Sequence, residues 1–171
     1  MRLRTIMIFP EFQNQEVIDN IRKQYDPFAR LVKPHITLVF PFESPMSNEE
    51  LTHILNKRLQ DVKPFELTLG GLSKHEDIFG NYIFLDVLQG AETLDYIHQI
   101  LYDNEFKEFD IGLQYIPHMT IGKLPTVELL NNAFRNIQSV NDTFSTVVKK
   151  ISVEMIGDNE ESIIVIEKEL I

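Results

Sequence analysis

The chain contains no cysteine, and it has no long apolar run. Without cysteine it can form no disulfide bond, thiolate zinc site or iron–sulfur cluster, and it has no thiol nucleophile. The short apolar run within residues 1–12 is broken at Pro10 and Glu11, which makes it too short for a signal sequence or a membrane span. No other stretch approaches the about 20 apolar residues that a spanning helix needs. We therefore expect a soluble cytoplasmic protein with no membrane partner.

Basic residues are also scarce. The 171 residues include 16 Lys and Arg against 26 Asp and Glu, for a formal net charge of −10. Proteins that bind long duplex nucleic acid gain affinity by neutralising many phosphates, usually with a basic stripe, and the basic residues here are scattered. A small cleft can still hold one or two phosphates, because the field inside a cleft is set locally. The charge balance thus favours a small or terminal phosphate substrate and no long duplex partner.

Two common groups of cofactor-binding motifs are missing. The chain has no glycine-rich phosphate loop and no dinucleotide-binding fingerprint, so nothing in it predicts ATP or NAD binding. The polar stretch around His75, Glu76 and Asp77 lacks the spacing of a metal site and is typical of a turn. The acidic residues 157–162 lack the spaced ligands of a calcium loop. We predict no cofactor and no metal.

The apolar residues, 43% of the chain with 12 Phe, suffice for the core of a single domain over residues 1–171, which we expect to be a monomer. Alternation and β-favouring residues predict strands, and apolar positions at helical spacing predict helices. The expected strands cover residues 3–9, 35–42, 65–73, 81–88, 118–124, 145–157 and 162–170, the last two forming a hairpin. The expected helices cover residues 13–25, 47–62, 92–105 and 126–138.

The order of these elements suggests a partial internal repeat. The second half repeats the alternation of the first without its opening strand, and no linker divides the chain. This pattern favours an α+β domain of two related lobes over two independent domains.

One short pattern occurs twice. "VKPHITLVFPF" (residues 32–42) and "YIPHMTIGKLP" (residues 115–125) share Pro-His-x-Thr-aliphatic, and His118 follows His35 by 83 positions (118 − 35). Because side chains alternate along a strand, His35 and Thr37 share one face, as do His118 and Thr120. Either the chain twice needs a histidine at a strand entrance for local reasons, or the two histidines meet. A single copy would favour the local explanation, whereas two copies with the same preceding proline favour the second.

Two histidines and two threonines suit acid–base chemistry on a phosphate ester. Histidine titrates near neutrality, so one copy can act as a neutral base and the other as a protonated acid. The hydroxyls of Thr37 and Thr120 can donate to the non-bridging phosphate oxygens. Tyr25 and Tyr115 are candidates for stacking on a nucleobase, although aromatic residues beside strands usually belong to the core.

Paired His-x-Thr-aliphatic motifs about 80 residues apart resemble the 2H phosphoesterase superfamily, which includes the bacterial 2′-5′ RNA ligase-like proteins. The segment "RKQYDP" (residues 22–27) is similar to a bacterial phosphoesterase branch. The resemblance implies two pseudo-symmetric lobes, each a mainly antiparallel sheet flanked by helices, around a central cleft. It implies catalytic roles for His35 and His118 and phosphate-binding roles for Thr37 and Thr120. Lys123, a further candidate for phosphate binding, stands where ligase-like members often have arginine, which keeps the charge but loses bidentate geometry.

Three hypotheses follow. The first is a metal-independent phosphodiesterase that hydrolyses a 2′,3′-cyclic or related ribose phosphate, on a nucleotide or at an RNA terminus. The second is 2′-5′ RNA ligation or cleavage of the 2′-5′ linkage. The third is a non-catalytic module that binds a nucleotide or an RNA end. The sequence does not show which histidine is the base, because that depends on their surroundings.

Overall fold

The computed structural model describes residues 2–171. The strands are β1 (Arg2–Ile8), β2 (Ile36–Ser44), β3 (Phe65–Asp77), β4 (Gly80–Gln89), β5 (His118–Leu124), β6 (Phe144–Val148), β7 (Lys150–Ile156) and β8 (Ser162–Glu169). The helices are α1 (Gln15–Tyr25), α2 (Asn48–Arg58), α3 (Ala91–Tyr102) and α4 (Val127–Ile137), with a short 3₁₀ turn at Lys107–Phe109.

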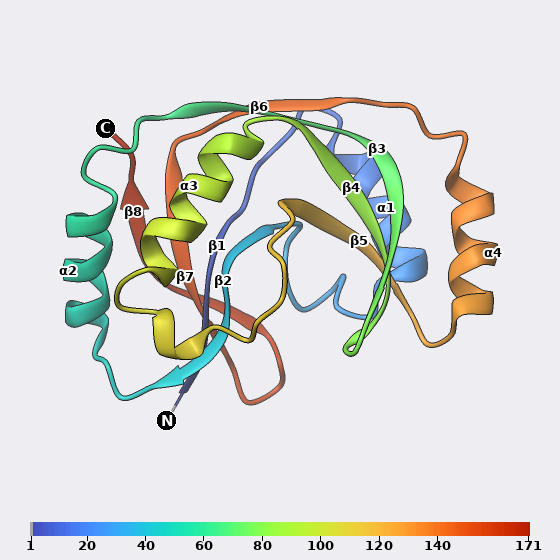
Figure 1. Cartoon of the computed structure of the whole chain (residues 1–171). Coiled ribbons are helices and arrows are strands. Elements are labelled where there is room, and N and C mark those ends of the chain that lie inside the picture. The colour runs from blue at the N-terminus through green and yellow to red at the C-terminus, as the bar shows by residue number, and fades with distance from the viewer. Residues whose placement is uncertain (1) are drawn as a thin grey trace.

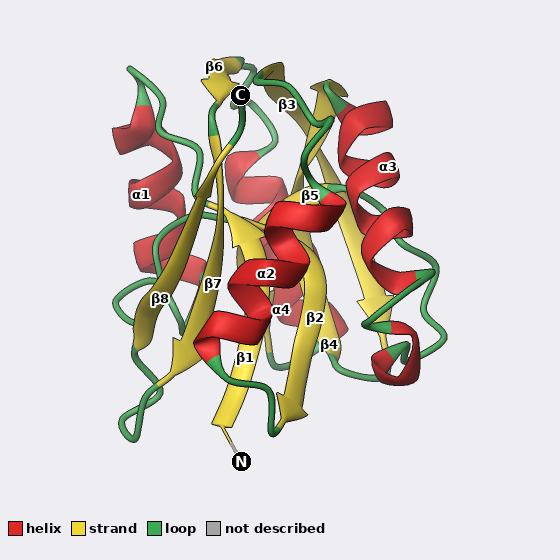
Figure 2. Cartoon of the chain, turned by 90° about the vertical axis from the view of Figure 1, so that its left-hand side faces the viewer, coloured by secondary structure: helices red, strands yellow, loops and turns green. Residues whose placement is uncertain are grey.

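The strands form two antiparallel sheets of four strands each. One sheet has the order β2-β1-β7-β8 and the other has the order β5-β4-β3-β6. Helices α2 and α3 pack on the first sheet, whereas α1 and α4 pack on the second (Figure 1). Turning the molecule by 90° shows α2 lying across the first sheet (Figure 2). The two-lobed α+β architecture is therefore confirmed.

The lobes are not the two halves of the chain. Helix α1 lies early in the sequence but packs against β5 of the second sheet. Strands β7 and β8 lie at the end of the sequence but complete the first sheet beside β1. The repeated order of elements in the two halves of the chain predicted the two lobes, but it did not predict this exchange of elements between them.

Two strand boundaries differ from the prediction. Residues 145–157 do not form one strand, because pairing changes at Lys149: β6 pairs with β3 and β7 pairs with β1. No glycine or proline marks this change of sheet, so the apolar pattern runs through it. Strand β3 also continues through Asp77, and only residues 78–79 form the turn to β4. The polar stretch after Ser73 is therefore strand, with polar side chains because it borders the site described below.

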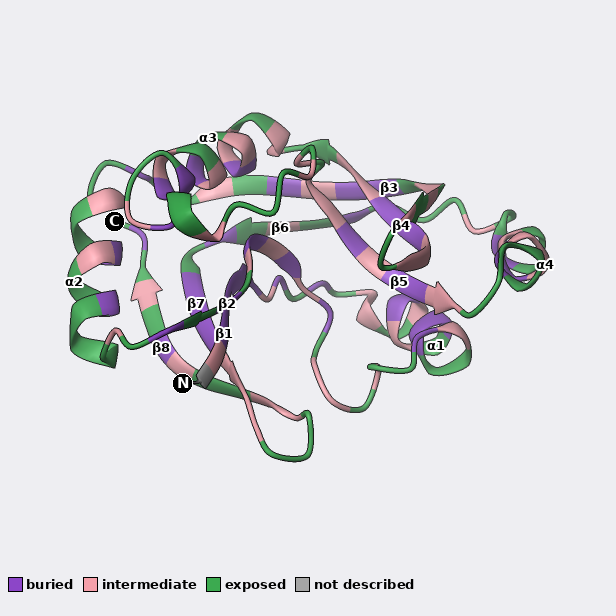
Figure 3. Cartoon of the chain, turned by 60° about the horizontal axis from the view of Figure 1, so that its bottom comes forward, coloured by how far each residue is buried: buried purple, intermediate pink, exposed green. Residues whose placement is uncertain are grey.

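A continuous cluster of buried apolar residues joins the helix-facing sides of both sheets (Figure 3). Ile36 and Leu38 of β2 and Met119 and Ile121 of β5 are almost fully buried, as alternation predicts. Each histidine motif is thus anchored by its aliphatic face. Within the described residues, no helix is long and apolar enough to cross a membrane.

The predicted start of α2 is confirmed. The Ser47 side chain accepts a hydrogen bond from the Glu50 backbone N–H, and the Glu50 carboxylate accepts one from the Ser47 backbone N–H. This reciprocal cap satisfies two backbone donors at the start of the helix.

Candidate active site

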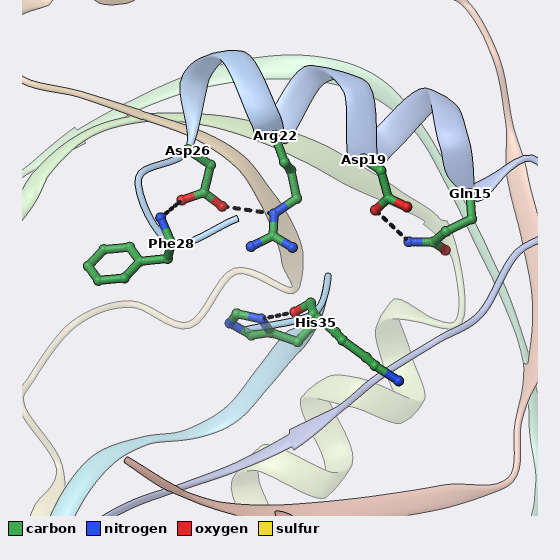
Figure 4. Close-up of polar contacts among 7 residues, drawn as sticks. Gln15, Asp19, Arg22, Asp26, Phe28 and His35 are labelled. Atoms are coloured by element: carbon green, nitrogen blue, oxygen red, sulfur yellow. Dashed lines mark hydrogen bonds and ion pairs between the residues drawn. The ribbon is translucent and has the colours of Figure 1, made fainter. Parts of the chain in front are cut away.

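Both histidines are held in the same way by the backbone. His35 lies directly before β2, and its Nδ1 is 2.8 Å from the Lys33 carbonyl oxygen (Figure 4). His118 begins β5, and its Nδ1 is 2.5 Å from the Ile116 carbonyl oxygen. A carbonyl oxygen can only accept, so each Nδ1 carries the hydrogen. In the neutral ring, Nε2 is therefore free to accept a proton, and in the charged ring it can donate one.

Burial lowers the pKa of both imidazoles. The pKa of His118 falls to about 4, mainly because the ring is buried, while its bond to the Ile116 carbonyl opposes the shift. The pKa of His35 is also lowered, again mainly by burial, and the Lys33 carbonyl opposes the shift. A charge on His35 is among the causes that lower the pKa of His118, so the His118 ring lies within the electrostatic field of His35. In the free protein at pH 7, burial thus favours the neutral form of both.

The charged groups around the two rings differ. Glu154 and Asp26 raise the pKa of His35 against the effect of burial, and Arg22 lowers it. Glu154 is almost fully buried on β7, and its Oε2 has no hydrogen-bond partner among residues 2–171. A charge on His75 lowers the pKa of His118, and the carboxylate of Asp77 raises it. Two carboxylates therefore favour a proton on His35, whereas only one favours a proton on His118.

Both threonines line the same cavity as His118. This cavity has a volume of about 600 Å³, and its wall includes Thr37 from β2 and Thr120 from β5. The strands β2 and β5 contact each other where the two sheets meet. Thr37, His118 and Thr120 are thus brought together at one cavity, whereas His35 is not part of its wall but lies close enough to His118 for its charge to lower the pKa of that ring.

The rest of this cavity is aromatic and apolar, which the sequence did not indicate. Phe84 stacks on His118 with ring centroids 3.5 Å apart and an interplanar angle of 18°. His75 stacks on the same Phe84 ring at 5.0 Å. Tyr82 and Phe84 share one face of β4 because they are two residues apart, and Phe79 closes the wall from the turn. Alternation in β4 was visible in the sequence, but which face lines the cavity depends on the pairing of β4 with β5.

Comparisons with known proteins agree with this geometry. A family model described as the 2′-5′ RNA ligase superfamily matches residues 9–159. The chain belongs to this superfamily. A Bacillus anthracis protein named "Putative phosphoesterase" is 33% identical over 121 residues, 69% of this chain and 67% of that protein. A Bacillus cereus protein of similar name is 32% identical over 121 residues, which again cover 69% of this chain and 67% of that protein.

Solved structures share the fold. The Thermus thermophilus protein TT0787 aligns with a TM-score of 0.65 and 15% identity, covering 98% of this chain and 97% of that one. Escherichia coli LigT, solved in complex with 3′-AMP, aligns with a TM-score of 0.62 and 14% identity, covering 99% of this chain and 98% of that one. At such low identity, these structures bear on the fold of this superfamily member and not on its substrate.

A β-bulge decides where Lys123 lies. In a regular strand, a residue five positions after His118 would point to the opposite face. The pairing of β5 with β4 shifts at Ile121, however, so that Lys123 lies opposite Tyr82, Thr120 opposite Phe84 and His118 opposite Asp86. These β4 residues alternate along one face, so Lys123 returns to the face of the histidine. Its Nζ lies 5.5 Å from the centre of the Tyr82 ring and 5.6 Å from that of Phe28, and it is not part of the cavity wall.

The two tyrosines lie outside that wall. The Tyr115 ring stacks on His98 with centroids 3.8 Å apart and an angle of 4°, and its hydroxyl donates to the Thr37 carbonyl at 2.8 Å. Burial raises the pKa of Tyr115. The Tyr25 hydroxyl accepts a hydrogen bond from Asn136. Base stacking by Tyr25 and Tyr115 stays a prediction, and Tyr115 already has one partner in His98.

Arg22 is a site residue that the sequence reasoning missed. It is 2% exposed, and its Nε donates to Asp26 Oδ2 at 2.8 Å. Asp26 in turn accepts from the Phe28 backbone N–H at 2.9 Å. The terminal nitrogens of Arg22 extend toward His35 (Figure 4). The i, i+4 spacing of Arg22 and Asp26 was the available signal, but such pairs are usually exposed on helices.

Proposed function

We propose that this protein is a metal-independent phosphodiesterase that hydrolyses 2′,3′-cyclic or related ribose phosphates, on a nucleotide or at an RNA terminus. The observation that carries the proposal is that two histidines close enough for their charges to interact are held in the same tautomer, one of them in the wall of the cavity that both threonines line. Both present Nε2, and the hydroxyls of Thr37 and Thr120 lie on the corresponding strand faces. A phosphate between the rings would meet a proton acceptor and a proton donor on opposite sides.

We assign His118 as the base and His35 as the acid. The pKa of His118, lowered to about 4, keeps Nε2 unprotonated at neutral pH, ready to take a proton from water. The water oxygen then bonds to phosphorus, and the bond from phosphorus to one ribose oxygen breaks. His35, whose charged form Glu154 and Asp26 favour, gives its Nε2 proton to that ribose oxygen. Thr37 and Thr120 donate to the non-bridging oxygens, and the product is a phosphate monoester with a free hydroxyl.

The names of the relatives support a phosphoesterase without fixing the substrate. LigT, which shares the fold, has been solved with ATP, 3′-AMP and NADP⁺. These complexes suggest a nucleotide substrate here. The apolar, aromatic wall formed by Phe79, Tyr82 and Phe84 suits a nucleobase or ribose.

An assay with purified protein and a panel of 2′,3′-cyclic nucleotides in the presence of EDTA tests the proposal. We expect turnover to a single 2′- or 3′-phosphate that is unaffected by the chelator. No turnover across the panel, with tight binding of nucleoside phosphates, would replace the proposal with a non-catalytic binding module.

The superfamily description favours one second candidate, RNA-end ligation or its reverse, cleavage of a 2′-5′ linkage. In that reaction a ribose hydroxyl takes the place of water, and the histidine roles are unchanged. Oligonucleotides with a cyclic-phosphate end, incubated with a 5′-hydroxyl partner strand, separate the two candidates. Joined product indicates ligation, whereas a linear phosphate end alone indicates hydrolysis.

A further inference from the structure

A second cavity lies beside the segment that leads into His35. It has a volume of about 820 Å³ and is lined by α1, by the loop of residues 29–34, and by β7 and β8. It adjoins the histidine through Lys33 and Pro34, which precede it, and through Phe9, whose ring centroid is 6.0 Å from that of His35. The loop is fixed at its far side, where the Leu31 carbonyl accepts from the Ser162 N–H at 2.9 Å.

This cavity is cationic in a protein that is acidic as a whole. Five Lys and Arg side chains line it against three carboxylates, whereas the whole chain has 16 against 26. Lys150 and Glu167 pair with each other at 2.6 Å. Glu11 and Asp19 supply the other two carboxylates. Three cations of this cavity are exposed, and their side chains form no hydrogen bond or ion pair with any of residues 2–171: Lys23, Arg30 and Lys33.

Arg22 gives the cavity a buried, fixed group that can bind an anion. Asp26 holds its Nε and fixes the plane of the guanidinium, but the terminal nitrogens donate to none of the described residues. The two terminal nitrogens of this guanidinium are therefore available to water or an anion. Its planar fork matches the oxygens of a phosphate.

From this arrangement we propose that the second cavity binds a second phosphate group of the substrate, through Arg22 and the exposed cations beside it. The inference rests on the proposed function and narrows its substrate class. The ester at the histidines belongs to a ribonucleotide that carries another phosphate, such as a 5′-phosphate, and the nucleoside itself lies in the aromatic cavity. A simple nucleoside cyclic phosphate then fills only half of the site.

The test compares adenosine 2′,3′-cyclic phosphate with the same compound carrying a 5′-phosphate. Charge-assisted hydrogen bonds are worth about 1.5–3 kcal/mol, so we expect kcat/KM about ten- to a hundredfold higher for the 5′-phosphorylated compound. The double variant K23A/R30A should remove most of this preference and leave kcat/KM for the simple compound unchanged. The control K57A/K63A removes two exposed cations elsewhere and should keep the preference.

Equal kcat/KM for the two compounds would overturn the proposal, as would a preference that survives the double variant. Arg22→Lys keeps the ion pair with Asp26 but loses the fork, and should lower the preference at least tenfold; removing the side chain entirely would leave Asp26 buried without its partner. If neither compound is hydrolysed, the proposed function fails, but the second site is still testable by calorimetry. Adenosine 3′,5′-bisphosphate should then bind at least tenfold more tightly than adenosine 3′-phosphate, and equal affinities would refute the second site.

Discussion

His35 and His118 are oriented by backbone carbonyls two residues earlier in the chain, and neither ring bonds to a carboxylate. A carbonyl fixes the tautomer without adding a full negative charge, so burial dominates and the pKa of both rings falls. The prolines that precede each histidine allow this turn at the strand entrance. The sequence showed the paired pattern, but the direction of the pKa shifts depends on what covers each ring.

The pH dependence of kcat/KM follows from these shifts. The base must be unprotonated, and the pKa of His118 is lowered to about 4, so activity should fall only when the pH drops toward 4. The acid must be protonated, and the pKa of His35 is lowered below 6.5, so activity should fall as the pH rises past that lowered value. We expect kcat/KM to be greatest on the acidic side of neutrality and to decline as the pH rises through the lowered pKa of His35. A rate profile with its maximum above pH 7 would contradict this assignment.

A substitution at Tyr115 separates the contribution of its hydroxyl to stability from that of its ring. Tyr115→Phe removes the hydrogen bond to the Thr37 carbonyl and keeps the ring against His98. We expect a loss of about 1 kcal/mol in the free energy of unfolding, measured with urea. Tyr96→Phe is the matched control, because Tyr96 is exposed on α3 and its hydroxyl has no partner among the described residues, so no change is expected. Equal stability of both variants would show that the Tyr115 bond contributes nothing.

Among the elements, β5 shows most clearly where sequence reasoning ends. Alternation correctly placed His118 and Thr120 on one face, and Met119 and Ile121 on the other. The same rule would have turned Lys123 away, and only the bulge returns it. A bulge depends on the neighbouring strand, so a single strand pattern cannot show it. The same limit explains why residues 145–157 were expected to form one strand.

Gly122 lies at this bulge and is a direct test of it. A Cβ at this position would come within 3.3 Å of the Tyr25 Cβ and 3.4 Å of the Ile83 Cβ. Gly122→Ala should therefore press α1 and β4 away from β5, at a cost of about 1–3 kcal/mol in the free energy of unfolding.

Chemical denaturation measures this cost, and Gly112→Ala provides a contrast. Gly112 has open space around it but a positive φ, so its cost comes from backbone strain alone. A Gly122→Ala protein as stable as the wild type would show that α1 and β4 do not pack closely against β5 at the bulge.

At the scale of the whole molecule, two lobes exchange elements, and β2 and β5, the strands of the two histidine motifs, contact each other. The repeated motif and the alternating elements were enough to predict the two lobes, and the joint action of His35 and His118 stays a prediction. They were not enough to find Arg22, because its neighbours come from α1, the following loop and β7. A buried cation shows itself only after these segments pack.

The charge of the whole molecule limits its nucleic-acid partners. With a net charge of −10 and five Lys and Arg side chains lining one cavity, the protein should bind a nucleic acid by its end and not along its length. We expect no gain in affinity between RNA duplexes of about 10 and about 20 base pairs, and a weak salt dependence that corresponds to about two phosphates. Fluorescence anisotropy at several salt concentrations measures both. Affinity that grows with duplex length would contradict the account.

The central claim is that His35 and His118 act together on one phosphate. It is tested most directly by kcat/KM for a 2′,3′-cyclic nucleotide in wild type, His35→Ala, His118→Ala and the double variant. Each single substitution should lower kcat/KM by about 10²–10⁴, and the double variant should be little worse than the poorer single one, because an acid and a base that serve one reaction lose their effect together. Turnover that survives both substitutions would contradict the account.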